Sequence, residues 1–418
     1  MAITETDAPS GDLRFIDSDG HILEPPTALL DYAPAAYQDR IWHIEFGDDG
    51  QEWMVFNGHR SIAQGGSGTA GFTDEESQAV WTGHYSKVRP AGWTADLRLD
   101  DLDADGIDLS VLYPTRLLGL QGVRDVDFGQ VQARAYNDWC CEHLKSGNGR
   151  LFGSGALPPM HEADDVSGVA EEIYRVAGMP GMVSVFMRPN PAVEWRPFDD
   201  PVYDPIWRAL EETGLPIGFH PFLTSDLPGA CAGLKLARPR NADGSYVTLE
   251  EMDAAEAKSM AETGRFLPNI YFEQALANPV DMMAAVTFIT AGGVAERFPG
   301  AKFIFLEANG GWLVPYLERL DHHAEKYSWD VPWLTMRPSE YFRRQCWISF
   351  DPDESFLEVT ATSPLVGADR IIWASDFPHH DAKFPGTTDA LREVMAGLTA
   401  DQQRAIAGES ALQLYGIG

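Results

Sequence analysis

The stretch FIDSDGHILEPP, residues 15–26, combines an apolar start with several carboxylates and one imidazole. Its first residues are typical of a buried strand, and two prolines end the segment. A core strand normally excludes acidic side chains, and a solvated turn has no need of a histidine. Asp19 and His21 are two residues apart, so their side chains point to the same side of an extended segment. The stretch therefore predicts metal ligands at the end of a strand, with Asp17 supporting the turn.

Eight short apolar runs in the chain each end in polar or special residues. They span residues 14–21, 109–115, 151–158, 182–189, 215–221, 301–309, 346–353 and 370–378. Helices are expected between several of them, at 131–146, 201–213, 312–327 and 388–396. Apolar strands that alternate with helices indicate a parallel sheet covered on both faces. We therefore predict an α/β fold, a (β/α)8 TIM barrel with its chemistry at the carboxyl ends of the strands. An open doubly wound sheet is the alternative, although no Gly-x-Gly-x-x-Gly follows the first strand.

Two segments are too long to be plain connections, and they predict insertions after the first and fifth strands, at about 26–105 and 222–300. The first contains IEFGDDGQEWMVFNG, residues 44–58, which is typical of a hairpin. The second is expected to be helical at 248–264 and 279–297. We predict one domain over residues 1–418, with both insertions forming a lid over the catalytic face.

Composition restricts the class of protein. A formal net charge of −32 argues against a nucleic-acid partner, because phosphate binding needs a basic surface. The sequence contains no run of eighteen apolar residues, so no membrane span is expected, and the acidic N-terminus resembles no targeting signal. The four cysteines lack metal-ligand spacing, which favours a reduced, cytoplasmic setting.

The ends of other predicted strands supply more candidate ligands. His220 stands in GFHP, Glu307 in IFLEANGG and Asp376 in WASDFPHH. Each residue alone has an ordinary explanation, such as a packed histidine or a turn. Together with Asp19 and His21 they meet at one mouth of a barrel, which favours a metal site for Zn, Mn or Fe.

Further donors exceed the needs of one ion, which usually takes about three or four protein ligands. The candidate metal ligands are Asp19, His21, Glu24, His220, Glu307, Asp376 and His379. This surplus indicates two metals. Alternatively, Glu24 is a carboxylate at a helix N-terminus, and Glu307, like Asp376, acts as a catalytic acid or base. His380 and Asp381 are candidates for orienting a ligand imidazole.

Several motifs together resemble a known family. The segments are DSDGHILEP, RLDDLDADGIDLSVLYPT, GFHP, GVAERFPGAKFIFLEANGGWLVPYLERLD and WASDFPHHD. They resemble the amidohydrolase-related barrels of the aminocarboxymuconate-semialdehyde decarboxylase type, over residues 15 to about 381. The resemblance implies that Asp19, His21, His220 and Asp376 hold a metal. The chain departs from the family at Glu307, where typical members have a catalytic histidine.

Within that family the chain is most similar to the TIM-barrel non-haem di-iron monooxygenases of diterpenoid (platensimycin/platencin) biosynthesis. This resemblance implies two iron ions, O2 and an external electron donor. It also implies an apolar, coenzyme A-linked small-molecule substrate of secondary metabolism and, by analogy, a homodimer. A Zn- or Mn-dependent hydrolase or non-oxidative decarboxylase is the alternative. A binding protein with a degenerate metal site is a third interpretation.

Candidate substrate-binding residues are basic. Arg116 and Arg188 follow the second and fourth predicted strands, where a guanidinium can clamp a carboxylate or phosphate. Lys235, Arg238 and Arg240 form a local basic run that suits coenzyme A phosphates. Salt bridges for the first two and a solvated loop for the run are the alternatives.

Overall fold

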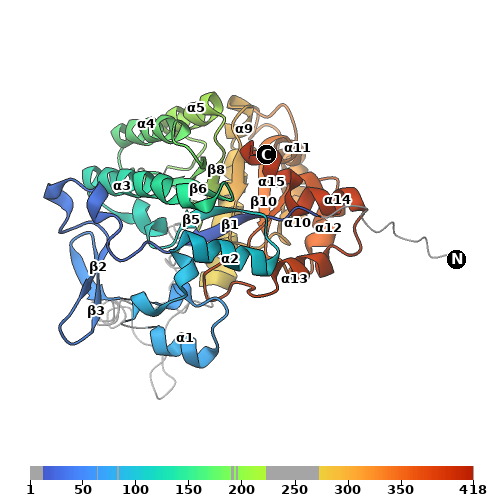
Figure 1. The fold of residues 1–418 in the computed structure, drawn as a ribbon. Coiled ribbons are helices and arrows are strands. Elements are labelled where there is room, and N and C mark those ends of the chain that lie inside the picture. The colour runs from blue at the N-terminus through green and yellow to red at the C-terminus, as the bar shows by residue number, and fades with distance from the viewer. Residues whose placement is uncertain are drawn as a thin grey trace, which may run out of the picture.

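The computed structural model describes residues 13–63, 65–81, 84–189, 193, 196–222 and 273–417. Its centre is a closed barrel of parallel strands in the order β1-β11-β10-β9-β8-β7-β6-β5 (Figure 1). The strands are β1 Ile16–Ile22, β5 Leu109–Pro114, β6 Leu151–Ala156, β7 Met182–Met187, β8 Ile217–Phe219, β9 Phe303–Phe305, β10 Cys346–Phe350 and β11 Ile371–Trp373. Each of the eight predicted runs overlaps one of these strands, so the predicted (β/α)8 barrel is confirmed.

Burial of nearly all their side chains stabilises the barrel strands. All residues of β5, β7, β8, β9, β10 and β11 lie in the interior. β1 is also wholly buried, although its sequence IDSDGHI is polar. A strand that keeps polar side chains in the core needs partners for each of them, so β1 is the element to explain.

Helices surround the barrel (Figure 1). They are α1 Asp74–Val80, α2 Ala95–Asp105, α3 Val126–Leu144, α4 Val166–Ala177, α5 Asp204–Thr213, α8 Asn278–Thr290, α9 Val294–Arg297, α10 Leu313–Lys326, α11 Pro338–Gln345, α12 Leu357–Thr362, α13 Thr387–Val394, α14 Ala400–Arg404 and α15 Ser410–Tyr415. The helices predicted at 131–146, 201–213, 312–327 and 388–396 correspond to α3, α5, α10 and α13. The second insertion differs in detail: the helix predicted at 279–297 is divided into α8 and α9, because Gly293 between them has a φ of 85°.

The first insertion contains the predicted hairpin and one more strand. β2 His43–Phe46, β3 Glu52–Phe56 and β4 His59–Ile62 form an antiparallel sheet outside the barrel (Figure 1). Asn57 and Gly58 have φ values of 53° and 74°, so this Asn-Gly pair makes the tight turn that joins β3 to β4. The same insertion reaches the segment after β11, where the Ala70 N–H donates to the Pro378 carbonyl over 3.0 Å. The lid role and the single domain stay predictions, and the helix predicted at 248–264 lies outside the described residues.

One helical stretch, Gln274–Arg297, is long and apolar enough to span a membrane, with a mean hydropathy of 1.2 in its best window. Its buried side chains include Met282, Val286 and Ile289, which belong to the main hydrophobic core. Packing of these side chains in the main hydrophobic core accounts for this composition. The absence of a membrane partner and the cytoplasmic location stay predictions.

Candidate metal centre

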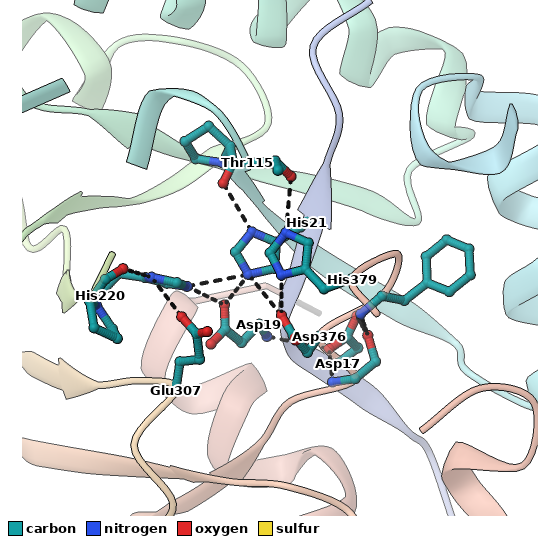
Figure 2. A network of polar contacts seen from close by, with 12 residues as sticks. Asp17, Asp19, His21, Thr115, His220, Glu307, Asp376 and His379 are labelled. Carbon is teal, nitrogen blue, oxygen red and sulfur yellow. Dashed lines mark hydrogen bonds and ion pairs between the residues drawn. The ribbon is translucent and has the colours of Figure 1, made fainter. Parts of the chain in front are cut away.

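Two neighbouring strands, β1 and β11, present three of the predicted ligands. Beyond the regular pairing of these strands, the Asp376 N–H donates to the Asp19 carbonyl over 3.0 Å, and the His21 N–H donates to the Phe377 carbonyl over 2.7 Å. His220 directly follows β8, and one residue, Leu306, separates Glu307 from the end of β9. Strand ends that are distant in sequence thus direct their side chains to one point (Figure 2).

The donor atoms lie within a few ångströms of one another. His21 Nε2 is 3.3 Å from His220 Nε2, 3.6 Å from Asp19 Oδ1 and 3.2 Å from Asp376 Oδ1. His220 Nε2 is 3.5 Å from the same Asp19 oxygen. Atoms of Asp19, His21 and His220 form one possible ligand group, and those of His21, Asp376 and His379 form another.

Hydrogen bonds determine which ring nitrogens are available. His21 Nδ1 is 2.9 Å from the Pro114 carbonyl oxygen, and His220 Nδ1 is 2.8 Å from the Pro221 carbonyl oxygen. A carbonyl only accepts, so each Nδ1 carries the proton and donates it. In its neutral form each ring therefore directs the lone pair of Nε2 into the centre, which is the orientation that a metal ligand needs.

A divalent cation fits this arrangement. Two facing imidazole lone pairs and two carboxylate oxygens repel one another unless a positive charge lies among them. Asp19 Oδ1 is also buried without a hydrogen-bond donor among the described residues, at a cost that a cation would remove. Imidazole and carboxylate donors suit Zn or Mn, and within the described part of the chain neither ligand group contains a cysteine.

The electrostatics of the two histidines differ. Burial lowers the pKa of His21 to about 4, which keeps this ring neutral. Burial also lowers the pKa of His220, but the charges of Asp19 and Glu307 outweigh it and raise the pKa to about 9. The surroundings of His220 thus favour a positive charge, as expected of a cation site.

Glu307 lies beside His220, on the side of the site away from His379 (Figure 2). Its Oε2 lies 3.3 Å from His220 Nδ1, and its Oε1 accepts from Gln274 Nε2 over 3.4 Å. Burial raises the pKa of Glu307 to about 8. The structure thus brings Glu307 to the ligand cluster but places it against the protonated nitrogen of His220, away from Nε2.

His379 lies beside the ligands and engages both of its ring nitrogens. Nδ1 is 2.7 Å from Asp376 Oδ1, and Nε2 is 3.2 Å from the Thr115 hydroxyl. Its ring stacks on that of His21 with centroids 4.0 Å apart. This geometry suits a residue that orients Asp376, whereas direct ligation by His379 stays a prediction.

Glu24 is buried, but its carboxylate faces backbone amides. The N–H of Arg116 lies 3.0 and 3.1 Å from its two oxygens, and the N–H of Leu117 donates to Oε1 over 3.0 Å. These residues begin the short helical turn after β5. Among the described residues Glu24 belongs to neither ligand group, which favours the alternative of a carboxylate at a helix N-terminus.

The predicted substrate-binding residues are placed only in part. Arg116 lies over the Tyr85 ring at 5.4 Å, and Arg188 lies over the Phe222 ring at 5.8 Å. The described lining of the cavity beside the ligands contains neither arginine. Lys235, Arg238 and Arg240 lie outside the described residues.

A cavity of about 290 Å³ opens beside the ligands, and several carboxylates line it. The lining residues are Asp19, Gln274, Ala275, Glu307, Ala308, Asn309, Asp351, Pro352, Asp353, Ala374, Ser375, Asp376, Asp381 and Lys383. Asp351, which follows β10 directly, was missed as a site residue. Its position at the carboxyl end of a strand is the pattern that could have predicted it, because active-site residues of such barrels lie at these ends.

Comparison with known proteins identifies the family, because residues 16–417 match the amidohydrolase family. The chain belongs to this family. It is 21% identical over 328 residues to 2-amino-3-carboxymuconate-6-semialdehyde decarboxylase of Dictyostelium discoideum, covering 78% of this chain and 77% of that protein.

Solved structures with the same fold include two that match nearly the whole chain. An amidohydrolase from Mycobacterium avium subsp. paratuberculosis matches with a TM-score of 0.69 and 20% identity, over 97% of this chain and all of that one. A dihydroxybenzoic acid decarboxylase from Polaromonas sp. JS666, with bound manganese and 2-nitroresorcinol, matches with a TM-score of 0.62 and 16% identity, over 97% of this chain and 98% of that one.

The prediction of a di-iron monooxygenase, and hence of an oxidoreductase using O2 and an electron donor on a coenzyme A-linked substrate, is wrong. The similar proteins named above are two decarboxylases and an amidohydrolase, and one of the decarboxylase structures contains manganese. The di-iron prediction rested on a surplus of donors. The Glu24 carboxylate accepts from backbone amides, and the ring nitrogens of His379 lie close to Asp376 and Thr115, so direct ligation by either residue stays a prediction.

Proposed function

We propose that this protein is a Zn- or Mn-dependent, non-oxidative decarboxylase of small carboxylic acids. The observation that carries the proposal is the convergence of Asp19, His21, His220 and Asp376 at the carboxyl ends of the strands, beside a cavity of about 290 Å³. Such a volume suits a single-ring substrate. The similarity to decarboxylases that share the barrel supports the same activity.

The ligand set would hold one divalent ion, with Asp19, His21, His220 and Asp376 as its protein donors. The ion, when bound, supplies Lewis acidity that polarises a substrate oxygen. The backbone carbonyls of Pro114 and Pro221 fix the tautomers of the two imidazoles. This orientation is ready before substrate binds, so binding energy is not spent on arranging ligands.

Decarboxylation breaks a C–C bond and leaves the electron pair on the substrate carbon, which must then take up a proton. Glu307 and Asp376 both line the cavity beside the ligands. We assign the proton delivery to Glu307, because Asp376 is engaged with His21 and His379 over 3.2 and 2.7 Å. Glu307 thereby takes the position in which typical family members have a histidine.

The test uses purified protein loaded with Mn²⁺ or Zn²⁺ and kept without oxygen. Release of CO2 from dihydroxybenzoates, 5-carboxyvanillate or an aminocarboxymuconate semialdehyde, and its loss after chelation, are the expected results. A chain that retains no metal, or metal-loaded protein that releases no CO2 while it hydrolyses esters or amides, contradicts the proposal. Glu307→Gln separates the roles of that residue: retained metal with lost turnover indicates proton transfer, and lost metal indicates ligation.

A further inference from the structure

We propose that Arg98, held by Asp17, is a positioning residue that sets the spacing of the ligands on β1 and β11. The inference rests on the metal centre proposed above and adds a part of the chain that touches neither metal nor substrate. The decisive observation is that one buried guanidinium bonds the backbones of both ligand-bearing segments.

Arg98 extends from α2, and its side chain is only 3% exposed. Its Nη1 donates to the carbonyl oxygens of His21 and Phe377, both over 3.2 Å. The guanidinium also lies 4.2 Å from the centroid of the Phe377 ring. The first carbonyl belongs to a proposed ligand and the second to the residue after Asp376. A single planar group therefore fixes two ligand-bearing segments relative to each other.

Asp17 compensates the buried charge and adds a second connection between the same strands. Its Oδ2 lies 3.8 Å from Arg98 Nη2 and accepts from the hydroxyls of Ser110 and Ser375 over 2.6 and 2.8 Å. Its Oδ1 accepts from the Ser375 N–H over 2.9 Å. Ser375 directly precedes Asp376, so this carboxylate joins β1 to the second ligand-bearing segment through side chain as well as backbone.

Gly20 leaves the room for this cluster. A Cβ at this position would lie 2.5 Å from Asp17 Oδ2 and 2.6 Å from both Arg98 Nη2 and Ser110 Oγ. The register between β1 and β5 also shifts between Asp17 and Gly20. The Asp-Ser-Asp-Gly-His sequence thus has two functions on opposite sides of the strand: Asp19 and His21 face the metal centre, and Asp17 with Gly20 accommodates Arg98.

Arginine is required for this arrangement. Its planar fork reaches two carbonyls and a carboxylate at once, whereas a lysine ammonium is a single point that loses part of this geometry. Residues that orient metal ligands typically change metal affinity by about 10- to 100-fold when they are altered. We therefore expect Arg98→Lys to bind metal about 10-fold or more weakly, with the ligands themselves unchanged.

The experiment loads the full-length protein with Co²⁺ and measures its affinity, its visible absorption spectrum and its melting temperature. Arg98→Lys keeps the charge, and the double variant Asp17→Asn/Arg98→Met removes both charges, so that no unpaired ion is buried. Arg150→Lys is the matched control. Arg150 also bonds two carbonyls and a carboxylate, those of Ile107, Asp108 and Asp103, but at the start of β5, the end away from the ligands.

Weaker Co²⁺ binding and an altered spectrum in both Arg98 variants, with wild-type values in Arg150→Lys, are the expected results. Wild-type affinity and spectrum in the folded Arg98 variants overturn the inference, as does an equal loss in Arg150→Lys. If the wild-type protein binds no Co²⁺, the proposed metal centre fails and the inference fails with it, which distinguishes the two errors.

Discussion

Asp351, a carboxylate that the metal centre does not use, makes the stability of the protein depend on pH. Burial, together with the charges of Glu354 and Asp376, raises the pKa of Asp351 from 3.8 to about 8. Its Oδ2 accepts from Asn309 Nδ2 over 2.8 Å, a bond that an asparagine oxygen can also accept. Asp351→Asn is therefore expected to stabilise the protein, and to do so more strongly as the pH rises.

The sign follows from proton binding. A folded-state pKa above the unfolded value means that the folded protein binds more protons, so Asp351 reduces stability as the pH rises from 3.8 to about 8. Each pKa unit corresponds to about 1.4 kcal/mol. Between pH 5.5 and 8.5 the advantage of Asp351→Asn should therefore grow by at most about 3 kcal/mol. A bound divalent ion favours the ionised carboxylate and lowers this ceiling.

The assay is urea unfolding of wild type and Asp351→Asn at both pH values, with the same metal content. Asp353→Asn is the control, because its side chain is 56% exposed and its ion pair with Lys383 spans 3.4 Å. An exposed pair of this kind contributes less than about 1 kcal/mol. A benefit of Asp351→Asn that is equal at both pH values, or that matches Asp353→Asn, refutes the reasoning.

Three further predictions concern the site and its support. Gly20→Ala should lower the free energy of unfolding by about 1–3 kcal/mol and weaken metal binding, because the added Cβ would lie 2.5–2.6 Å from neighbouring atoms. Gly178→Ala is the control and should do neither, because the nearest atom to its Cβ is 3.5 Å away. Equal losses of stability in the two variants contradict this prediction. Glu24→Ala should destabilise the protein by about 2 kcal/mol, because the N–H groups of Arg116 and Leu117 lose their acceptor, while metal content measured by mass spectrometry stays unchanged; a loss of metal from the folded variant shows that Glu24 is a ligand. Removal of metal by a chelator should lower the melting temperature and abolish turnover, and Mn²⁺ or Zn²⁺ should restore both; a chelated protein that stays active contradicts the proposed centre.

The barrel was predictable because its signal is repeated along the chain. Eight apolar runs with polar ends determine the strand order, since a closed parallel barrel brings each end to the same mouth. The convergence of Asp19, His21, His220 and Asp376 follows from this topology alone, and the described structure brings all four together.

What the sequence did not reveal depends on partners that no local pattern encodes. Arg98 lies in the first half of α2, and the carbonyls to which it donates are 77 and 279 residues away. Glu24 likewise acquires its role from amides 92 and 93 residues away. Residue type and position at a strand end predict which side chains lie at the mouth of the barrel. Their hydrogen bonds determine which of those side chains remain available to bind a metal.

The backbone itself shows which side chains the mouth requires. Glu307, Asn309 and Asp376 have φ values of 46°, 53° and 53°, in the left-handed region that favours glycine. Each such residue costs on the order of 1 kcal/mol or more, which glycine would avoid. The chain keeps side chains at these positions, and two of them are the carboxylates that follow β9 and β11 beside the ligands. Both carboxylates line the cavity beside the ligands. At Glu307 and Asp376 the chain thus keeps a strained backbone together with the carboxylate that the proposed chemistry needs. Glu307→Gly and Asp376→Gly should relieve the backbone strain and still lose activity. A glycine variant that retains activity would show that the strained position is not needed for function.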